Sequence, residues 1–153
     1  MIIYGFTLYF NVLHNKESQF DQSEKIILNE TNLVSVENVS RFHGEQLFHV
    51  LTGKDKTGDI FYAFLPKVKS DKKQEITMIN HANILSKQMI KKEWKDSCQS
   101  CQYIDMVPGL VDEQPVWEMK YMDQSGRYVF DYLSMYDGSS VEEFRLKRFY
   151  NHE

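Results

Sequence analysis

The chain has 153 residues, and its 18 lysines and arginines against 22 aspartates and glutamates give a formal net charge of -4. Hydrophobic residues make up 42% and aromatic residues 14%, which excludes a disordered or low-complexity chain. The acidic balance argues against non-specific nucleic-acid binding, because such binding needs a basic surface. The length suits one compact unit or two very small ones.

The N-terminal segment, residues 1–13, is apolar and uncharged, and the sequence then turns polar at His14. It is too short to cross a bilayer, and it lacks the basic flank of a signal peptide. Two interpretations remain open: the remnant of an N-terminal membrane anchor, or an apolar lead that packs on the core.

An internal repeat is the most informative feature of the sequence. A shift of 68 positions aligns Asp55–Gly58 with Asp123–Gly126, and Ile60–Leu65 with Tyr128–Leu133. The same shift places Ile76 and Met78 on Phe144 and Leu146. Two copies are too few for a solenoid, so the pattern indicates the tandem duplication of one small fold.

Each copy is predicted to contain a helix followed by short strands. In the first copy we expect a helix over 18–29 and strands over 34–42, 46–52, 59–65 and 74–79. In the second copy we expect a helix over 82–95 capped by Asn80, and strands over 103–107, 116–121, 127–135 and 141–150. Gly58 supplies the positive φ that closes the first hairpin. The pattern predicts an α+β fold in which each helix packs on an antiparallel sheet of three to four strands.

Both faces of the third predicted strand in each copy are apolar, because alternate residues on both faces are hydrophobic. A helix covers only one face of such a sheet. The second face must therefore meet the other copy, another chain or water, and we expect the two sheets to form one body.

Cys98 and Cys101 form a CxxC pair that follows the predicted second helix. A reactive pair usually lies at a helix N-terminus, where the dipole lowers the thiol pKa, whereas the carboxyl end raises it. A structural disulfide in an oxidising compartment is therefore favoured over a thiol-redox role, and both remain hypotheses.

The remaining residues predict no catalytic, cofactor-binding or metal site. The histidines lack ligand spacing, and the paired acids Asp112-Glu113 and Glu142-Glu143 are best explained by solvated positions, the latter two on opposite strand faces. Tyrosine is enriched at protein interfaces, so the candidate contact residues are Tyr62, Tyr132 and Tyr136.

The two hairpin motifs resemble a known family. The segments Gly53-Lys-Asp-Lys-Thr-Gly58 and Val116-Trp-Glu-Met-Lys-Tyr-Met-Asp-Gln-Ser-Gly-Arg-Tyr128 resemble the YpmB-like, or TseB-like, cell-wall elongation regulators of Gram-positive bacteria. The resemblance covers nearly the whole chain, and its motifs are structural turns and strands. They therefore specify fold better than activity.

The resemblance implies two tandem PepSY-like, cystatin-like units, at residues 14–79 and 80–153. It also implies a single N-terminal membrane anchor, an extracytoplasmic folded part without enzymatic activity, and a partner that is a penicillin-binding protein or another wall-synthesis protein. The alternatives are a PepSY-type protease-inhibitor or propeptide-like module, by analogy of fold alone, and the thiol-redox protein. The oligomeric state stays open.

Overall fold

The computed structural model describes residues 19–67 and 75–146. The apolar segment 1–13, for which an anchor is expected, lies outside the described residues. So does most of the basic connector between the third and fourth strands.

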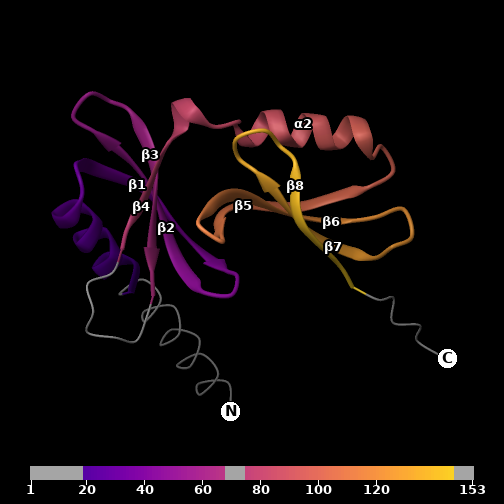
Figure 1. Cartoon of the computed structure of the whole chain (residues 1–153), viewed down its shortest axis with the longest axis horizontal. Helices are drawn as coiled ribbons and strands as arrows, with labels where there is room; N and C mark the ends of the chain where they lie inside the picture. Colours follow the sequence, from indigo (N-terminus) through magenta and orange to yellow (C-terminus); the bar gives the residue numbers. More distant parts are fainter. Residues whose placement is uncertain (1–18, 68–74, 147–153) are drawn as a thin grey trace, which may run out of the picture.

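The described chain forms two units of similar construction (Figure 1). In the first unit, a helix described over residues 19–30 precedes β1 (Leu33–His43), β2 (Leu47–Asp55), β3 (Ile60–Pro66) and β4 (Thr77–Asn80). In the second, η1 (His81–Asn83) and α2 (Lys87–Ser97) precede β5 (Gln102–Val111), β6 (Gln114–Met122), β7 (Tyr128–Ser134) and β8 (Ser140–Arg145). Each unit has one antiparallel sheet of four strands in sequence order, which confirms the predicted α+β fold of two tandem units.

The central hairpins of the two units superimpose residue for residue at the predicted shift of 68. Gly53 pairs with Phe61 in the first unit, and Tyr121 pairs with Val129 in the second. The outermost strands follow a different shift, because Tyr62 pairs with Ile79 whereas Phe130 pairs with Phe144. The expected alignment of Ile76 and Met78 with Phe144 and Leu146 is therefore wrong, since β7 and β8 are joined by a shorter connection than β3 and β4.

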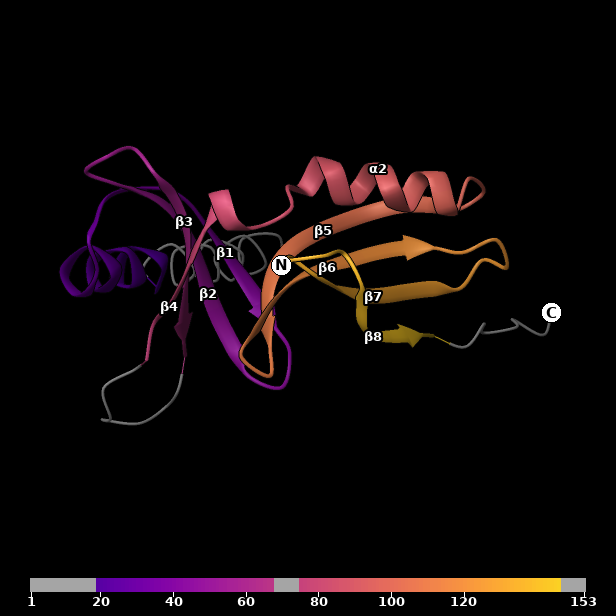
Figure 2. The same cartoon turned by 45° about the horizontal axis from the view of Figure 1, so that its top comes forward.

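The predicted helix over 82–95 is in fact two elements. Asn80 caps only the short η1, where its side chain accepts a hydrogen bond from the Ala82 backbone. The backbone then becomes extended at Ile84, and Ser86 caps α2 by accepting from the Met89 N–H at 3.2 Å. Two competing N-caps within six residues explain the difference. Figure 2 shows α2 lying along the sheet of the second unit.

The predicted end of the fifth strand at residue 107 is also wrong. β5 continues to Val111, and Asp112 and Glu113 make the turn into β6 with φ angles of 48° and 64°. Aspartate is one of the residues that tolerate this left-handed region best, which suits Asp112, and the turn lies where two polar residues follow an apolar strand.

The core has two parts, and the larger one joins the units. The first helix packs on one face of its sheet in a cluster made by Ile27, Leu33, Leu51, Ala63 and Leu65. The opposite face contributes Phe42, Phe48, Val50 and Phe64 to a cluster that also contains Trp94, Trp117 and Met119 of the second unit. The second apolar face of the first sheet therefore meets the other copy, which is one of the three possibilities that the sequence pattern leaves open.

Candidate functional site

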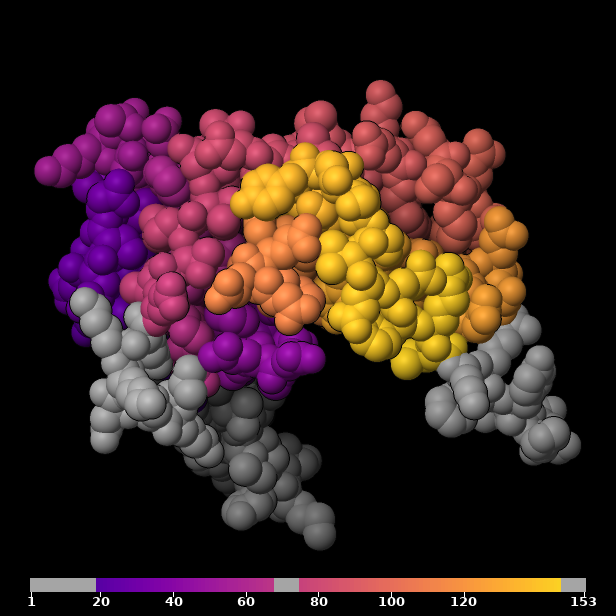
Figure 3. All heavy atoms as spheres, in the orientation of Figure 1, coloured from indigo at the N-terminus to yellow at the C-terminus, as the bar shows by residue number. Residues whose placement is uncertain are grey.

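A groove of about 810 Å³ lies where the two units meet. Figure 3 shows the surface on this side, with the turn between β1 and β2 (purple), the turn between β5 and β6 (orange) and β8 (yellow) next to one another. The described residues that line the groove are His43, Gly44, Glu45, Gln46, Phe48, Leu110, Val111, Asp112, Glu113, Tyr132, Val141, Glu142 and Phe144.

Aromatic rings form the floor of this groove. The Tyr132 ring contacts Phe42 of the first unit at 6.3 Å between centroids and Phe144 of β8 at 6.1 Å, both edge to face. The chain comes close to the Phe42 ring because residue 109 is glycine, where a Cβ atom would overlap that ring. The floor is thus built from both units, and it cannot form in either unit alone.

The hydroxyl of Tyr132 is held beneath the floor rather than offered to a partner. Tyr132 is 9% exposed, and burial together with its hydrogen bond to Glu118 raises the pKa of its phenol. The Glu118 carboxylate lies 3.6 Å from Lys120 Nζ, which supplies the opposite charge. These contacts fix the Tyr132 ring, so the groove presents a rigid apolar surface.

The rim of the groove is acidic. Among its described lining residues are the carboxylates of Glu45, Asp112, Glu113 and Glu142, and the lining contains no lysine or arginine. Asp112 and Glu113 are held by the turn into β6, and Glu142 extends from β8 on the same face as Phe144, because alternate residues of a strand share a face. The groove therefore combines an apolar floor with negative charge at its edges.

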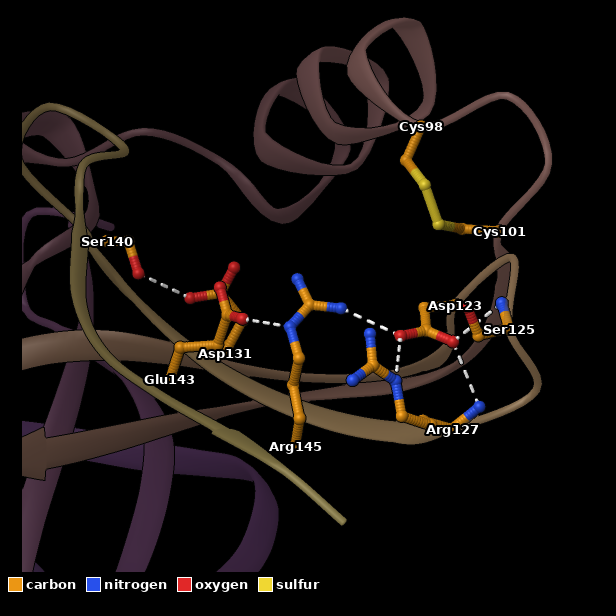
Figure 4. Close-up of polar contacts among 9 residues, drawn as sticks. All are labelled: Cys98, Cys101, Asp123, Ser125, Arg127, Asp131, Ser140, Glu143 and Arg145. Carbon is orange, nitrogen blue, oxygen red and sulfur yellow. Dashed lines mark hydrogen bonds and ion pairs between the residues drawn. A yellow bond between two sulfur atoms is a disulfide. The ribbon is translucent and has the colours of Figure 1, made fainter. Parts of the chain in front are cut away.

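Ionic contacts hold β8 in place from the other face of the sheet (Figure 4). Arg145 donates to Glu143 at 2.5 Å and to Asp123 at 2.8 Å. Asp123 also accepts the backbone N–H groups of Ser125 and Arg127, each at 2.9 Å, so it closes its hairpin turn. Hydrogen bonds from several donors lower the pKa of Asp123 and keep it ionised.

The three predicted contact tyrosines do not lie together. Tyr62 is half-buried between the units, with its ring 5.7 Å from that of Trp117 and 4.0 Å from that of His81. Tyr132 is in the groove floor, and Tyr136 is 54% exposed in the turn before β8. Their role as contact residues stays a prediction, and Tyr132 is the only one of the three among the described groove-lining residues.

Cys98 and Cys101 are joined by a disulfide. It follows the carboxyl end of α2, where the Cys98 N–H still bonds to the Trp94 carbonyl at 2.9 Å, and it precedes β5. The helix dipole at this end disfavours a thiolate. The bond braces the turn between α2 and β5, on the other side of the second sheet from the groove.

A serine and a histidine do meet inside the first unit. Ser23 Oγ lies 2.6 Å from His49 Nδ1, and the Lys67 ammonium donates to the same hydroxyl at 3.4 Å. Ser23 and His49 are both fully buried between the first helix and its sheet, so no substrate reaches them. Burial, with smaller contributions from Lys67 and Arg41, lowers the pKa of His49 to about 4. This neutral pair is structural.

Within residues 19–67 and 75–146, no group of three or more histidine, cysteine, aspartate or glutamate side chains could hold a metal ion. None of the helices in these ranges combines the length and the hydropathy of a membrane-spanning segment.

The sequence interpretation missed most of the groove. Asp112, Glu113 and Glu142 are visible in the sequence as paired acids, and Glu142 and Glu143 do point to opposite faces of β8, as predicted. Phe144 and Phe48 carry no sequence signal of their own. An exposed aromatic next to two acids on a terminal strand is the signal that could have indicated this surface.

Three comparisons relate the chain to known proteins. A family model described as "Cell wall elongation regulator TseB-like domain" matches residues 22–66. The "Probable cell wall elongation regulator TseB" of Bacillus subtilis (strain 168) is 24% identical over 142 residues, which are 93% of this chain and 86% of that protein. The solved structure titled "YpmB protein from Bacillus subtilis" has a TM-score of 0.67 and 25% identity, over 77% of this chain and 90% of that one. The three agree with the family that the hairpin motifs indicate.

Proposed function

We propose that this chain, a YpmB/TseB-like protein, regulates cell-wall elongation without catalysing a reaction, by binding a wall-synthesis protein in the groove between its two units. The homology to a probable cell wall elongation regulator supports the regulatory role. The partner that we propose is a transpeptidase-type penicillin-binding protein. The folded part works outside the cell and is held at the membrane by an anchor to which residues 1–13 belong.

The observation that carries the proposal is the groove itself. Its floor needs both units, since the Phe42 ring reaches Tyr132 across their junction. Phe144 stands at its edge with 49% of its surface exposed, although a side chain of this size gains about 2 kcal/mol or more when it is buried. An exposed ring beside a rigid aromatic floor is typical of a protein contact surface. The Cys98–Cys101 disulfide supports an oxidising, extracytoplasmic compartment.

The test is site-specific photo-crosslinking in living cells, with the crosslinker at Phe144 and, as a control, at Ile104 of β5. Ile104 is 46% exposed and lies in the same sheet outside the groove lining, so the two positions match in burial. Captured penicillin-binding proteins are identified with a fluorescent penicillin. We expect one such protein to be captured from position 144 and not from position 104.

A second arm connects binding with function. Phe144→Asp should abolish complementation of a strain that lacks the gene, measured as cell length and wall incorporation, whereas Ile104→Asp should complement. Both residues are exposed, but Phe144→Asp also removes the edge-to-face contact with Tyr132, so circular dichroism must first show that both variants fold. Equal capture from both positions, or full complementation by Phe144→Asp, would show that the groove is not the regulatory surface.

A further inference from the structure

The groove is bordered by a strand whose outer edge is open. β8 pairs only with β7 in its sheet, and all six of its residues are exposed. The opposite edge strand of that sheet, β5, is instead packed near β1 of the first unit. Residues 140–145 contain no proline, and their charged side chains, Glu142, Glu143 and Arg145, favour pairing only with a strand of complementary charge.

The hydrogen-bond phase shows which backbone groups of β8 are available. The N–H of Leu146 bonds to the carbonyl of Tyr128 at 2.9 Å, so the backbone N–H of Leu146 points to β7. In an antiparallel sheet the backbone groups of successive residues point alternately to the two sides of the strand. The backbone N–H and carbonyl of Phe144 therefore also point to β7, whereas those of Glu143 and Arg145 point away from the sheet. These outward groups are the ones that an added strand would bond.

The charge around this edge selects the added strand. Side chains of a strand next to β8 would extend alternately over the groove face, beside Glu142 and Phe144, and over the opposite face. On the groove face they would meet Glu142 directly, with Glu113, Asp112 and Glu45 among the other lining residues. Cationic and apolar side chains fit these positions, whereas acidic ones would be repelled.

We propose that the groove binds an extended, lysine- or arginine-bearing segment of a protein partner, which adds to the second sheet as a further strand along β8. Backbone hydrogen bonds to β8 supply much of the affinity, one apolar side chain packs against Phe144, and cationic side chains meet the acidic rim. This inference rests on the proposed function and specifies the partner's contact chemistry.

A second copy of this chain fits the same edge less well. In a register that places Glu142 or Glu143 opposite the same residue of a second chain, antiparallel pairing of β8 with its own copy brings like charges together, which is destabilising. Concentration-dependent dimerisation of the chain through β8 would therefore overturn the proposal.

The experiment measures binding of short fluorescent peptides to the purified full chain by anisotropy. The probe peptide alternates threonine with lysine or leucine, so that one face is cationic and apolar. Two matched peptides serve as comparisons: one carries glutamate in place of lysine, and one carries N-methyl groups on alternate backbone amides. We expect binding of the probe only, weakened about tenfold when salt rises from about 0.05 M to about 0.5 M.

Variants of the protein separate the two contributions. Glu142→Lys should weaken binding about tenfold or more, whereas Asp96→Lys, an equal charge change on exposed α2, should leave it unchanged. Glu143→Pro removes an outward N–H and should abolish binding, whereas Glu143→Ala keeps the backbone donor and should retain it. Circular dichroism and thermal unfolding verify that each variant folds.

The outcomes distinguish this inference from the function on which it rests. If the glutamate peptide binds as well as the lysine peptide, or if the N-methylated peptide binds as well as its parent, the basic added strand is wrong. The crosslinking experiment at Phe144 would then still test the proposed function independently. If neither a groove crosslink nor peptide binding is found, both proposals fail.

Discussion

At the scale of single residues, His49 shows how position within the repeat decides the character of a side chain. Its counterpart in the second unit is Trp117, and both are buried in the central hairpin of their sheets. At this buried position His49 forms a hydrogen bond with Ser23, and burial lowers the pKa of its imidazole to about 4. In the folded state this histidine is therefore uncharged at neutral pH.

The low pKa predicts that stability falls in mild acid. Below pH 6.5 the unfolded chain takes up a proton at this imidazole, whereas the folded chain does so only near pH 4. The contribution of His49 is thus complete above pH 6.5 and is lost as the pH falls to 4, by about 3 kcal/mol in the free energy of unfolding.

Denaturant unfolding at a series of pH values tests this prediction, with His49→Leu as the comparison. The variant will be less stable at neutral pH, since it loses the Ser23 contact, but its stability should fall less steeply between pH 6.5 and 4. Parallel pH profiles for the two proteins would show that His49 is not the titrating group.

At the scale of elements, the disulfide between α2 and β5 has a role that can be measured. It closes a very short loop, so its loss should cost about 2 kcal/mol in the free energy of unfolding. Cys98→Ser/Cys101→Ser should therefore unfold at lower denaturant concentration and still bind its partner, because the bond lies away from the groove. Loss of binding by a folded double variant would favour the thiol-redox hypothesis.

The order and type of the elements could be predicted because the signals for them are local. Asp55 and Asp123 each accept backbone N–H groups two and four residues ahead, and a glycine with positive φ follows in each turn. Such turns are encoded within a few residues. The start of α2 was missed because Asn80 and Ser86 are both good caps, and only packing decides between them.

The groove could not be predicted because it depends on contacts between distant parts of the chain. Phe42 and Tyr132 are far apart in sequence, and nothing near either residue indicates that their rings meet. Tyr62 and Tyr132 were chosen for their residue type, yet the fold buries most of each. Which aromatic stays exposed is decided by the joining of the units, and this left Phe144 at the surface.

At the scale of the whole molecule, the shared core predicts cooperative unfolding. Phe42, Phe48 and Phe64 of the first unit belong to the same buried cluster as Trp117 and Met119 of the second. Separation of the units would expose these side chains, at roughly 2 kcal/mol each, which is a large part of the stability of a small domain. The two units should therefore unfold in one transition.

Fluorescence can follow this transition, because both tryptophans, Trp94 and Trp117, lie in the second unit. Their emission should change at the same denaturant concentration as the far-ultraviolet circular dichroism of the whole chain. Expression of residues 80–153 alone should yield a poorly folded product. Two separate transitions, or a stable isolated second unit, would contradict a shared core.

The contact between Phe42 and Gly109 also limits which units can pack against each other. The two residues hold equivalent places, since Phe42 pairs with Phe48 in one sheet and Gly109 pairs with the corresponding Val116 in the other. The first unit provides the Phe42 ring, and the second provides the space left by the missing side chain of Gly109, so two first units could not make this contact with each other. In a chain built from two identical first units, a phenylalanine side chain would occupy the space that Gly109 leaves for the Phe42 ring, so the two units could not pack in this way.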